Sequence, residues 1–514
     1  MALTLPSNTG RTLASAAFFV GVAILAALVG IIAAWFPLTF SLGLTGLLGL
    51  LVVFLMAVIL PSHLHAPGGL LRGMIALVLV VSALWPGYVT FKYGAAPGMN
   101  PTRLAYWCLV MLWFFWFTAS PKLRQHLFAQ LGGFKGYHGL LVVFVVWQLL
   151  ASAVSSSPFA SSYYLVKLLF GGYLFYLVVL GVMRDAEDVE RAVTWVVIAA
   201  ALVSLIGMLE GFRKANLFAG LFPTDPEQLE TLQWIILDKT RSGAYRVAST
   251  FSHPLAFAEY LTMCLPLAAY LVRNGQTRWR KVLGLGALPL MLVALYLSRT
   301  RSALVVAAIV AVTLMLIVGV RATAQRRNFL HAVIGTCLMV GVLLAMVGGG
   351  GLLTELTLGR DAAERGSTYA RVDMMARGST LVALEPLAGY GPGRAAITLG
   401  AQPGHVNISI DNYYLSVALE SGLPGLLLFF LTLAYPIALG LFRGLTQPTR
   451  TGWMALALAS ALLAFAAERG VLSLTNNLDF SLMLIAMLLV TELHIRRERK
   501  AAGASHKYRV PHAA

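Results

Sequence analysis

The sequence predicts an all-α polytopic membrane protein with about fourteen transmembrane helices. Of the 514 residues, 59% are apolar and only 11% are charged, and the mean hydropathy is +0.79. A soluble domain carries about 25% charged residues, so most of this surface must face lipid instead of water. The third observation is a series of apolar runs that are long enough to cross a bilayer.

These runs follow one another along almost the whole chain. They are expected near 13–34, 38–60, 70–91, 103–118, 138–156, 163–182, 192–212, 255–272, 282–298, 302–320, 329–349, 412–442, 452–468 and 480–495. The first run is longer than the apolar part of a signal peptide, so we interpret it as a retained helix. The run 412–442 is too long for one straight span, and Gly422, Pro424 and Gly425 are expected to kink or break it.

The placement of Lys and Arg predicts the orientation. If the N-terminus is cytoplasmic, most cationic residues fall in inside segments and in the tail, as the positive-inside rule requires. We therefore expect an inner-membrane protein with both termini in the cytoplasm. The predicted parts are an N-terminal bundle (1–212), a periplasmic loop (213–254), core helices (255–349), a large periplasmic loop (350–411), C-terminal helices (412–495) and a basic tail (496–514).

Charge and cysteine usage exclude several other classes. The net charge of +17 would suggest nucleic-acid binding in a soluble protein, but membrane topology explains it here, so no nucleic-acid partner is expected. Cys108, Cys264 and Cys337 lie inside apolar runs without CxxC or Cys/His spacing. Neither a disulfide framework nor a zinc site is predicted, and no metal or other cofactor is expected.

The strongest local signal is the segment Ser298-Arg299-Thr300-Arg301-Ser302. It forms the whole turn between two predicted spans, on the outer side where positive charge is disfavoured, and it contains no acid. An anionic ligand at the membrane interface explains two cations there. The alternative is contact with lipid headgroups by snorkelling. Arg246 and His253 precede another span at the same interface, and His253 is either a proton carrier or a cap of the helix start.

Four ionisable residues lie inside predicted apolar runs: Lys167, Glu210, Glu259 and Glu420. Charges of this kind are costly in a membrane and usually face a cavity or a partner. Two interpretations stay open. The residues either take part in catalysis or form structural pairs, such as Lys167 with Glu259 or an arginine with Glu420.

The large outer loop 350–411 combines arginines, glycines and an acid. It carries five Arg and no Lys, at positions 360, 365, 371, 377 and 394. Arginine suits bidentate binding of phosphate, although a solvated helix with acidic partners one turn away, such as Asp361, Glu364 and Asp373, is the alternative. The glycines of 386–393 permit a close backbone approach but lack the Lys-Ser/Thr of a nucleotide-binding loop. Asp411, at a helix entrance, is either an N-cap or a general base.

Taken together, these residues resemble the bacterial O-antigen ligase and polymerase superfamily, integral membrane glycosyltransferases that act on undecaprenyl-pyrophosphate-linked glycans. The resemblance covers roughly 240–440. It rests on the order, the spacing and the membrane placement of four motifs. These are Arg246 with Phe251-Ser252-His253-Pro254, the Ser-Arg-Thr-Arg-Ser turn, Arg371 upstream of Glu385–Gly393, and Asp411-Asn412-Tyr413-Tyr414-Leu415 followed by Glu420-Ser421-Gly422.

The resemblance implies a helical bundle with one large periplasmic loop between late spans, which 350–411 matches. Family members are thought to bind the lipid pyrophosphate through periplasmic arginines, and Arg246 and Arg301 occupy those motif positions. Ligases typically carry a histidine in a His-Asn-x-x-Leu-like motif after the large loop. This chain has Asp411 there, with His405 six residues earlier, and the departure favours a polymerase. No metal dependence is implied.

The resulting hypothesis is a metal-independent transfer of glycan from undecaprenyl pyrophosphate to the sugar hydroxyl of a lipid-linked repeat, in O-antigen or exopolysaccharide biosynthesis. Arg301 and Arg246 would hold the pyrophosphate, and Asp411 or His405 would accept the proton. The remaining substrate-binding candidates are Arg299, Arg371, Arg377, Lys167, His253, Tyr413 and Glu420. The expected partners are the lipid-linked glycan, the bilayer, and chain-length regulator and export proteins.

Three rival functions stay open at this point. A ligase would differ from a polymerase only in its acceptor, and a non-catalytic assembly partner would carry out no transfer. A lipid-linked glycan exporter or other transporter should place its charged residues along a pathway near the midplane. The candidates here gather at the outer interface, which favours an enzyme.

Overall fold

The structure is a computed structural model that describes residues 66–91, 98–221, 240–241, 244–323, 362–400, 410–472, 475 and 477–507. The chain divides into two units, one of Met1–Ala66 with Phe114–Leu123 and one of Pro67–Trp113 with Arg124–Ala514. All the contacts described below lie within the second unit.

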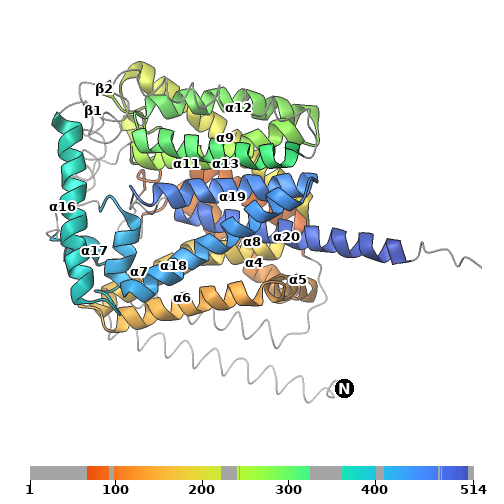
Figure 1. The fold of residues 1–514 in the computed structure, drawn as a ribbon, viewed down its shortest axis with the longest axis horizontal. Coiled ribbons are helices and arrows are strands. Elements are labelled where there is room, and N and C mark those ends of the chain that lie inside the picture. Colours follow the sequence, from red (N-terminus) through yellow and green to blue (C-terminus); the bar gives the residue numbers. More distant parts are fainter. Residues whose placement is uncertain are drawn as a thin grey trace, which may run out of the picture. The chain divides into compact units, whose positions relative to one another are not determined.

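The described chain is helical apart from one short hairpin, so the protein is an all-α polytopic membrane protein (Figure 1). The helices are α3 (Gly68–Leu84), α4 (Pro101–Ala119), α5 (Pro121–Gly132), α6 (Lys135–Ala153), α7 (Pro158–Leu168), η1 (Leu169–Tyr173), α8 (Leu174–Val182), α9 (Ala186–Arg213), η2 (Ala219–Leu221), α11 (Pro254–Asn274), α12 (Arg278–Leu297), α13 (Arg301–Thr323), α16 (Ala362–Leu384), α17 (Ala395–Thr398), α18 (Tyr413–Thr446), α19 (Arg450–Glu468) and α20 (Leu478–Lys507). The antiparallel hairpin pairs β1 (Thr240–Arg241) with β2 (Ala244–Tyr245).

Among the described residues, ten helical segments are long and apolar enough to cross a membrane. Together with the shorter α3 they fall on the predicted runs, except that α3 ends at Leu84 instead of continuing to 91. The predicted runs 13–34, 38–60 and 329–349 lie outside the described residues. Helix α5, a less apolar helix of 12 residues, does not correspond to any predicted run.

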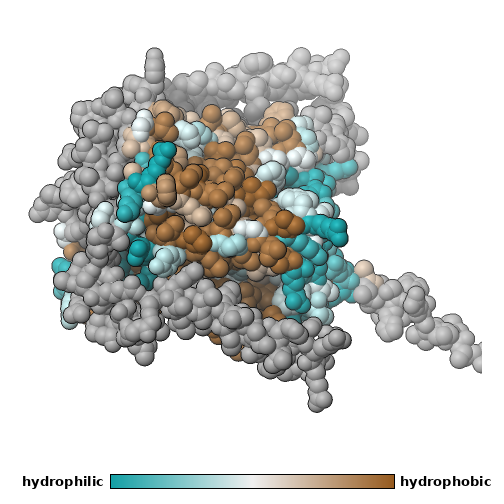
Figure 2. Space-filling view, turned by 90° about the horizontal axis from the view of Figure 1, so that it is seen from above, coloured by the Kyte–Doolittle hydropathy of each residue, from teal (hydrophilic) through white to brown (hydrophobic). Residues whose placement is uncertain are grey.

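Apolar side chains remain exposed on the outward faces of the spans. Val142 on α6, Leu285 on α12 and Leu427 on α18 are each about 60% exposed. Figure 2 shows such residues gathered in a central band, with hydrophilic residues on either side of it. Lipid tails solvate a band of this kind, whereas water would not.

The centre of the bundle is formed by α11, α19 and α20, which are the most deeply buried spans. Small residues allow their neighbours to approach closely. A Cβ added at Gly284 on α12 would lie 2.8 Å from the carbonyl oxygen of Ala268, and one at Gly440 on α18 would lie 2.5 Å from the Cβ of Ala459. Close backbone approach at small residues is how helices pack in lipid.

Helix α18 is broken where the sequence predicted a kink. Ser421 and Gly422 have non-helical backbone angles, with φ of 68° at Gly422. A break of this kind leaves carbonyl groups without their partners inside the helix, and such groups must be satisfied when they lie in a membrane. The indole N–H of Trp147, on α6, donates a hydrogen bond of 2.8 Å to the carbonyl of Ser421.

The glycine-rich segment 386–393 satisfies the other carbonyl groups at this break. The N–H of Tyr390 donates to the carbonyl of Leu419 at 2.7 Å, and the N–H of Gly391 donates to the carbonyl of Glu420 at 2.9 Å. Gly391 has a φ of 102°, which favours glycine. The segment therefore clamps the broken helix, and this clamp is the structural use of its glycines.

Candidate functional site

The predicted arginine turn joins α12 to α13, as expected. Helix α12 ends at Leu297, Arg301 begins α13, and Arg299 is exposed with a φ of 54°. The segment after the hairpin packs against this turn, because the Nε of Arg246 donates to the carbonyl of Ser298 at 3.4 Å. The structure therefore brings Arg246 to the turn that holds Arg299 and Arg301, although about fifty residues separate them in sequence.

Glu210, at the far end of α9, fixes the segment that carries Arg246. Its buried carboxylate accepts hydrogen bonds from the hydroxyl of Tyr245 at 2.7 Å and from the backbone N–H groups of Ala248 and Ser249. Burial and the negative charge of Glu210 raise the pKa of Tyr245, so this hydroxyl stays protonated and keeps donating. Glu210 is therefore a positioning residue for Arg246.

Glu259 pairs with Arg469, not with Lys167. Both side chains of the pair are fully buried, and the Nε of Arg469 lies 2.9 Å from Oε1 of Glu259. Asn477 donates a hydrogen bond of 2.7 Å to the other carboxylate oxygen. The alternative of a Lys167–Glu259 pair is therefore wrong, because Lys167 is exposed and its charge interacts with Asp479.

Glu468, the last residue of α19, is a buried carboxylate beside the arginine turn. Its side chain is 1% exposed and interacts with the charges of Glu259 and Arg469. Ser302 is its polar neighbour, and neither oxygen of Glu468 has a hydrogen-bond partner in the described chain. Neither Glu468 nor Arg469 was predicted as a site residue, although both stand at the end of a predicted span.

Asp411 pairs with Arg371 across the entrance to α18. The Nε of Arg371 lies 3.0 Å from Oδ2 of Asp411, and the two side chains are 33% and 23% exposed. The N-cap of α18 is Asn412, whose side chain accepts from the N–H of Leu415 at 3.1 Å. The interpretation of Asp411 as the N-cap is therefore wrong, because its neighbour takes that position.

Tyr413 connects the Asp411 segment to the buried ion pair. Its N–H donates to the carbonyl of Arg469 at 2.8 Å, and the guanidinium of Arg469 lies 5.3 Å from the centre of its ring. One end of the spans thus holds Arg246, the arginine turn, Glu259, Glu468, Arg469, Arg371, Asp411 and Tyr413. We refer to this set as the outer cluster.

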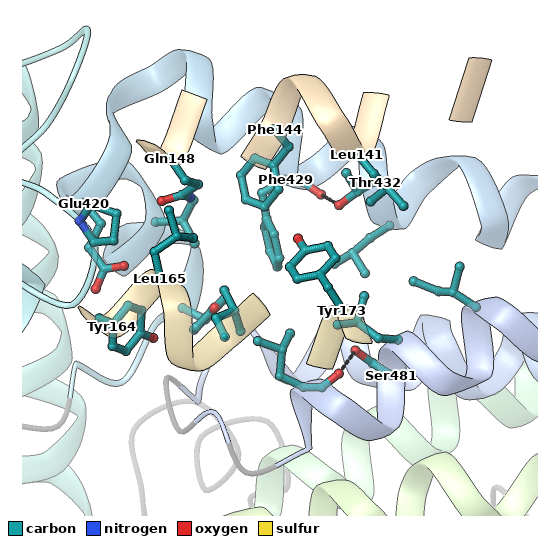
Figure 3. A pocket seen from close by; sticks show the side chains of 18 of the residues that line it. Leu141, Phe144, Gln148, Tyr164, Leu165, Tyr173, Glu420, Phe429, Thr432 and Ser481 are labelled. Carbon is teal, nitrogen blue, oxygen red and sulfur yellow. Dashed lines mark hydrogen bonds between the residues drawn. The ribbon is translucent and has the colours of Figure 1, made fainter. Parts of the chain in front are cut away.

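A cavity lies next to the outer cluster and shares Tyr413 with it (Figure 3). Its wall is mainly apolar, with additional polar groups from Gln148, Tyr164, Tyr173 and Ser481. Glu420 lies at one end, near Tyr164, and its carboxylate accepts from the backbone N–H groups of Gly393 and Ala395. Within the described residues these donors, and no arginine, hold Glu420, so the expected arginine–Glu420 pair is not formed there.

The remaining predicted residues have simpler surroundings. His253 caps α11, because its Nδ1 accepts from the N–H of Leu255 at 3.1 Å, which confirms the capping interpretation. Arg377 and Asp373 form an exposed i,i+4 ion pair on α16. His405 lies outside the described residues. In the part of the chain that the structure describes, no three His, Cys, Asp or Glu side chains are grouped so that they could hold a metal.

Comparison with known proteins supports the resemblance. Residues 286–430 match the family model described as O-antigen ligase. An O-antigen polymerase of Salmonella muenchen is 24% identical over 273 residues, which cover 52% of this chain and 65% of that protein. The match thus spans less than two thirds of the relative's length. The two findings together support the assignment of this chain to the O-antigen ligase and polymerase superfamily.

The region that matches the family model contains much of the outer cluster. It includes the arginine turn, Arg371, Asp411 and the break in α18, whereas Arg246, Glu259 and Arg469 lie outside it. The structure therefore adds residues from α11, α19 and the hairpin segment to the part that the family model identifies.

Proposed function

We propose that this chain is a periplasm-facing polysaccharide polymerase of the inner membrane. It transfers glycan from undecaprenyl pyrophosphate to the hydroxyl of a lipid-linked repeat unit. The observation that carries the proposal is the outer cluster, in which Arg246 packs against the turn of Arg299 and Arg301 while Asp411 and Glu468 lie at the same end of the spans.

The arginines supply the electrostatic part of the reaction. Breaking the bond between the sugar and the pyrophosphate leaves negative charge on the departing lipid pyrophosphate, and guanidinium groups fixed at that place stabilise it. Arg469 is neutralised by Glu259, so its role is to position the turn after α19. Arg299 and Arg301 lie in the turn 298–302, which contains no acid, and Arg246 comes from the segment that packs against this turn. Three arginines gathered in this way suit a dianionic group.

Asp411 is the base in this proposal. The acceptor hydroxyl loses its proton to the carboxylate as its oxygen bonds to the sugar carbon, and the carbon–oxygen bond to pyrophosphate breaks. The ion pair with Arg371 orients the carboxylate. Glu468 is the rival base, because it is the carboxylate beside the turn whose oxygens have no hydrogen-bond partner among the described residues.

The cavity beside Tyr413 gives the sugar a place near the outer cluster. Aromatic rings and a few polar groups are the usual lining of a small-molecule pocket. Tyr164, Tyr173 and Phe429 supply rings, and Gln148 and Glu420 supply polar groups. Occupation of this cavity by a saccharide is part of the proposal.

A ligase is the second candidate function, because the matched family model is described as O-antigen ligase. It would use the same donor chemistry and a different acceptor. The similarity to a protein named as a polymerase, and Asp411 at the position where ligases typically carry histidine, favour the polymerase.

The test is the glycan phenotype of a deletion strain, sized for both surface polysaccharide and undecaprenyl-linked intermediates. A polymerase predicts single-repeat lipid intermediates and no long polymer. Full-length polymer retained on the lipid carrier would establish the ligase instead. Single repeats trapped on the cytoplasmic side would favour an exporter, and unchanged glycan would overturn all three functions.

A further inference from the structure

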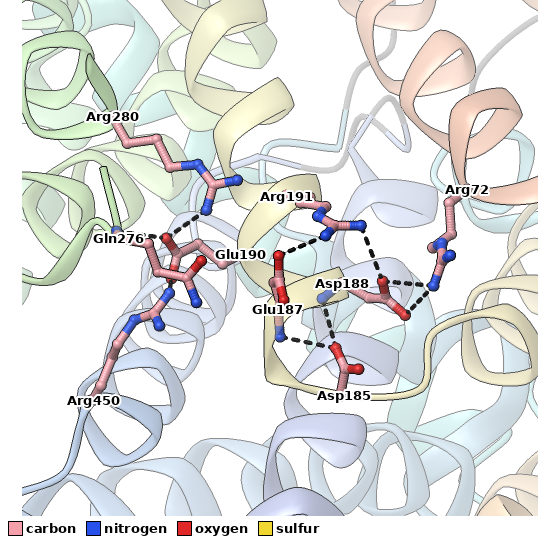
Figure 4. Close-up of polar contacts among 9 residues, drawn as sticks. All are labelled: Arg72, Asp185, Glu187, Asp188, Glu190, Arg191, Gln276, Arg280 and Arg450. Carbon is pink, nitrogen blue, oxygen red and sulfur yellow. Dashed lines mark hydrogen bonds and ion pairs between the residues drawn. The ribbon is translucent and has the colours of Figure 1, made fainter. Parts of the chain in front are cut away.

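The end of the bundle opposite the outer cluster carries a second group of charges, whose acids are all engaged. Asp185 caps α9, and Glu187 and Asp188 pair with Arg191 and Arg72 (Figure 4). Glu190 is fully buried and is bound by Arg280, Arg450, the hydroxyl of Tyr270 and the N–H of Gln276. Glu492 pairs with Arg443 and Arg496, and Glu498 pairs with His494.

Arg273 and Arg321, at this end, share one aromatic ring and have no acidic partner in the described chain. Arg273, at the end of α11, and Arg321, near the end of α13, both lie against the ring of Trp453, at 4.3 Å and 4.1 Å from its centre. Arg321 donates to the carbonyl of Gln447, but its Nε and Nη1 are buried and have no partner among the described residues. Arg273 is exposed.

The sequence around this pair offers no counter-charge either. Residues 324–350, which follow α13, and residues 501–514, at the end of the chain, contain no Asp or Glu. Burial, followed by the charge of Arg273, lowers the pKa of Arg321 to about 10. Two like charges held against one ring, one of them with buried donors that lack acceptors among the described residues, are unfavourable unless an anion joins them.

We propose that Arg273, Arg321 and Trp453 form a binding site for a phosphate group, carried by an anionic phospholipid of the leaflet at this end. A guanidinium stacked on an aromatic ring keeps its N–H edge available for a phosphate oxygen. Tryptophan and arginine both favour the interface at which phospholipid phosphates lie. Basic pockets between transmembrane helices are a known means of binding anionic headgroups.

The test uses the full chain, purified in neutral detergent, and the midpoint of thermal unfolding as the readout. Phosphatidylglycerol should raise the midpoint in a saturable manner, whereas phosphatidylcholine should not. Arg273→Gln should weaken the apparent affinity for phosphatidylglycerol about five- to tenfold, as expected for the loss of one interfacial cation. Arg278→Gln is the matched control, because it removes a charge that is also exposed at the same end and should keep the wild-type affinity.

Two further arms decide the ligand and guard against misfolding. An equal midpoint shift with inorganic phosphate would support the phosphate site but assign it to a free anion; a shift with the lipid alone assigns it to the headgroup. Arg321→Gln should weaken the affinity for phosphatidylglycerol as Arg273→Gln does. If Arg321→Gln does not fold, the result for Arg273→Gln tests the site by itself, because Arg273 is exposed. Equal weakening by Arg273→Gln and Arg278→Gln, or equal stabilisation by both lipids, would overturn the site.

Discussion

The carboxylate of Glu259 on α11 is neutralised by Arg469, 210 residues later in the chain, and neither side chain is exposed. The pair joins the start of α11 to the end of α19. It also fixes the backbone carbonyl of Arg469, to which the N–H of Tyr413 donates a hydrogen bond. A charge left alone at this depth has no water to solvate it, so the two residues are expected to depend on each other.

The first prediction follows from that dependence. Arg469→Met should lower the free energy of unfolding by about 3–5 kcal/mol, because it leaves a buried carboxylate without its counter-charge. Glu259→Leu should cost a similar amount, and the double variant should recover a large part of the loss. Thermal unfolding of the purified variants measures this. Additive losses in the double variant would show that the two side chains are not coupled.

The second prediction concerns the arginine turn. Arg301→Lys should reduce polymer formation by about 10²-fold or more with normal protein abundance, because lysine keeps the charge but loses the planar fork that binds phosphate. Arg103→Lys is the control, since Arg103 is exposed at the same end of the spans and lies outside the outer cluster. Near-normal polymer length in the Arg301 variant would remove this residue from the mechanism.

The third prediction separates the two candidate bases. Asp411→Asn should reduce the transfer rate by about 10²- to 10⁴-fold, the usual contribution of a general base, while Glu468→Gln should reduce it less. The assay is transfer of glycan between purified lipid-linked repeats at several pH values. Activity that survives in Asp411→Asn and disappears in Glu468→Gln would assign the proton transfer to Glu468.

The fourth prediction concerns the clamp on α18. Gly391→Ala should destabilise the protein because a Cβ there would lie 2.1 Å from Oγ of Ser155, in addition to the cost of a φ of 102°. Gly400→Ala is a matched control, since its φ is 100° and no atom lies within 4 Å of the added Cβ. The control should therefore lose only the backbone part, of order 1–3 kcal/mol. Equal shifts of the unfolding midpoint would contradict the clamp.

The fifth prediction is a pH dependence at the end of the bundle opposite the outer cluster. His126 lies on α5, outside the spans, and burial lowers its pKa from 6.5. The folded protein then binds fewer protons than the unfolded chain, so His126 should lower stability as the pH falls from about 6.5 through its folded pKa. His126→Gln should flatten this part of the curve of unfolding midpoint against pH. A variant with the wild-type slope would show that another group is responsible.

The sequence predicted the spans well because lipid imposes a simple rule of length and apolarity on each helix. It predicted the arginine turn for a similar reason, since Arg299 and Arg301 stand where the expected topology disfavours positive charge. The break in α18 was also predictable, because Gly422 and Pro424 occur inside a run that is too long for one span.

Partners across the bundle were not predictable in this way. The apolar pattern along α11 does not tell which helix lies beside Glu259, so Arg469 could not be recognised as its partner. Asp411 and Asn412 are equally good N-caps by residue type, and only the backbone decides between them. Glu468 could have been found, because it stands at the end of a predicted run just as Glu210 does.

The clamp on α18 has a mechanical consequence. Helix α16 ends at Leu384, and the carbonyl of Pro386 accepts a hydrogen bond of 2.8 Å from the N–H of Leu423, just beyond the break. The same few residues therefore follow the end of α16 and hold the wall of the cavity at Glu420. A displacement of α16 would therefore reach that wall through only a few residues of backbone, so α16 and the part of α18 next to the break should move together.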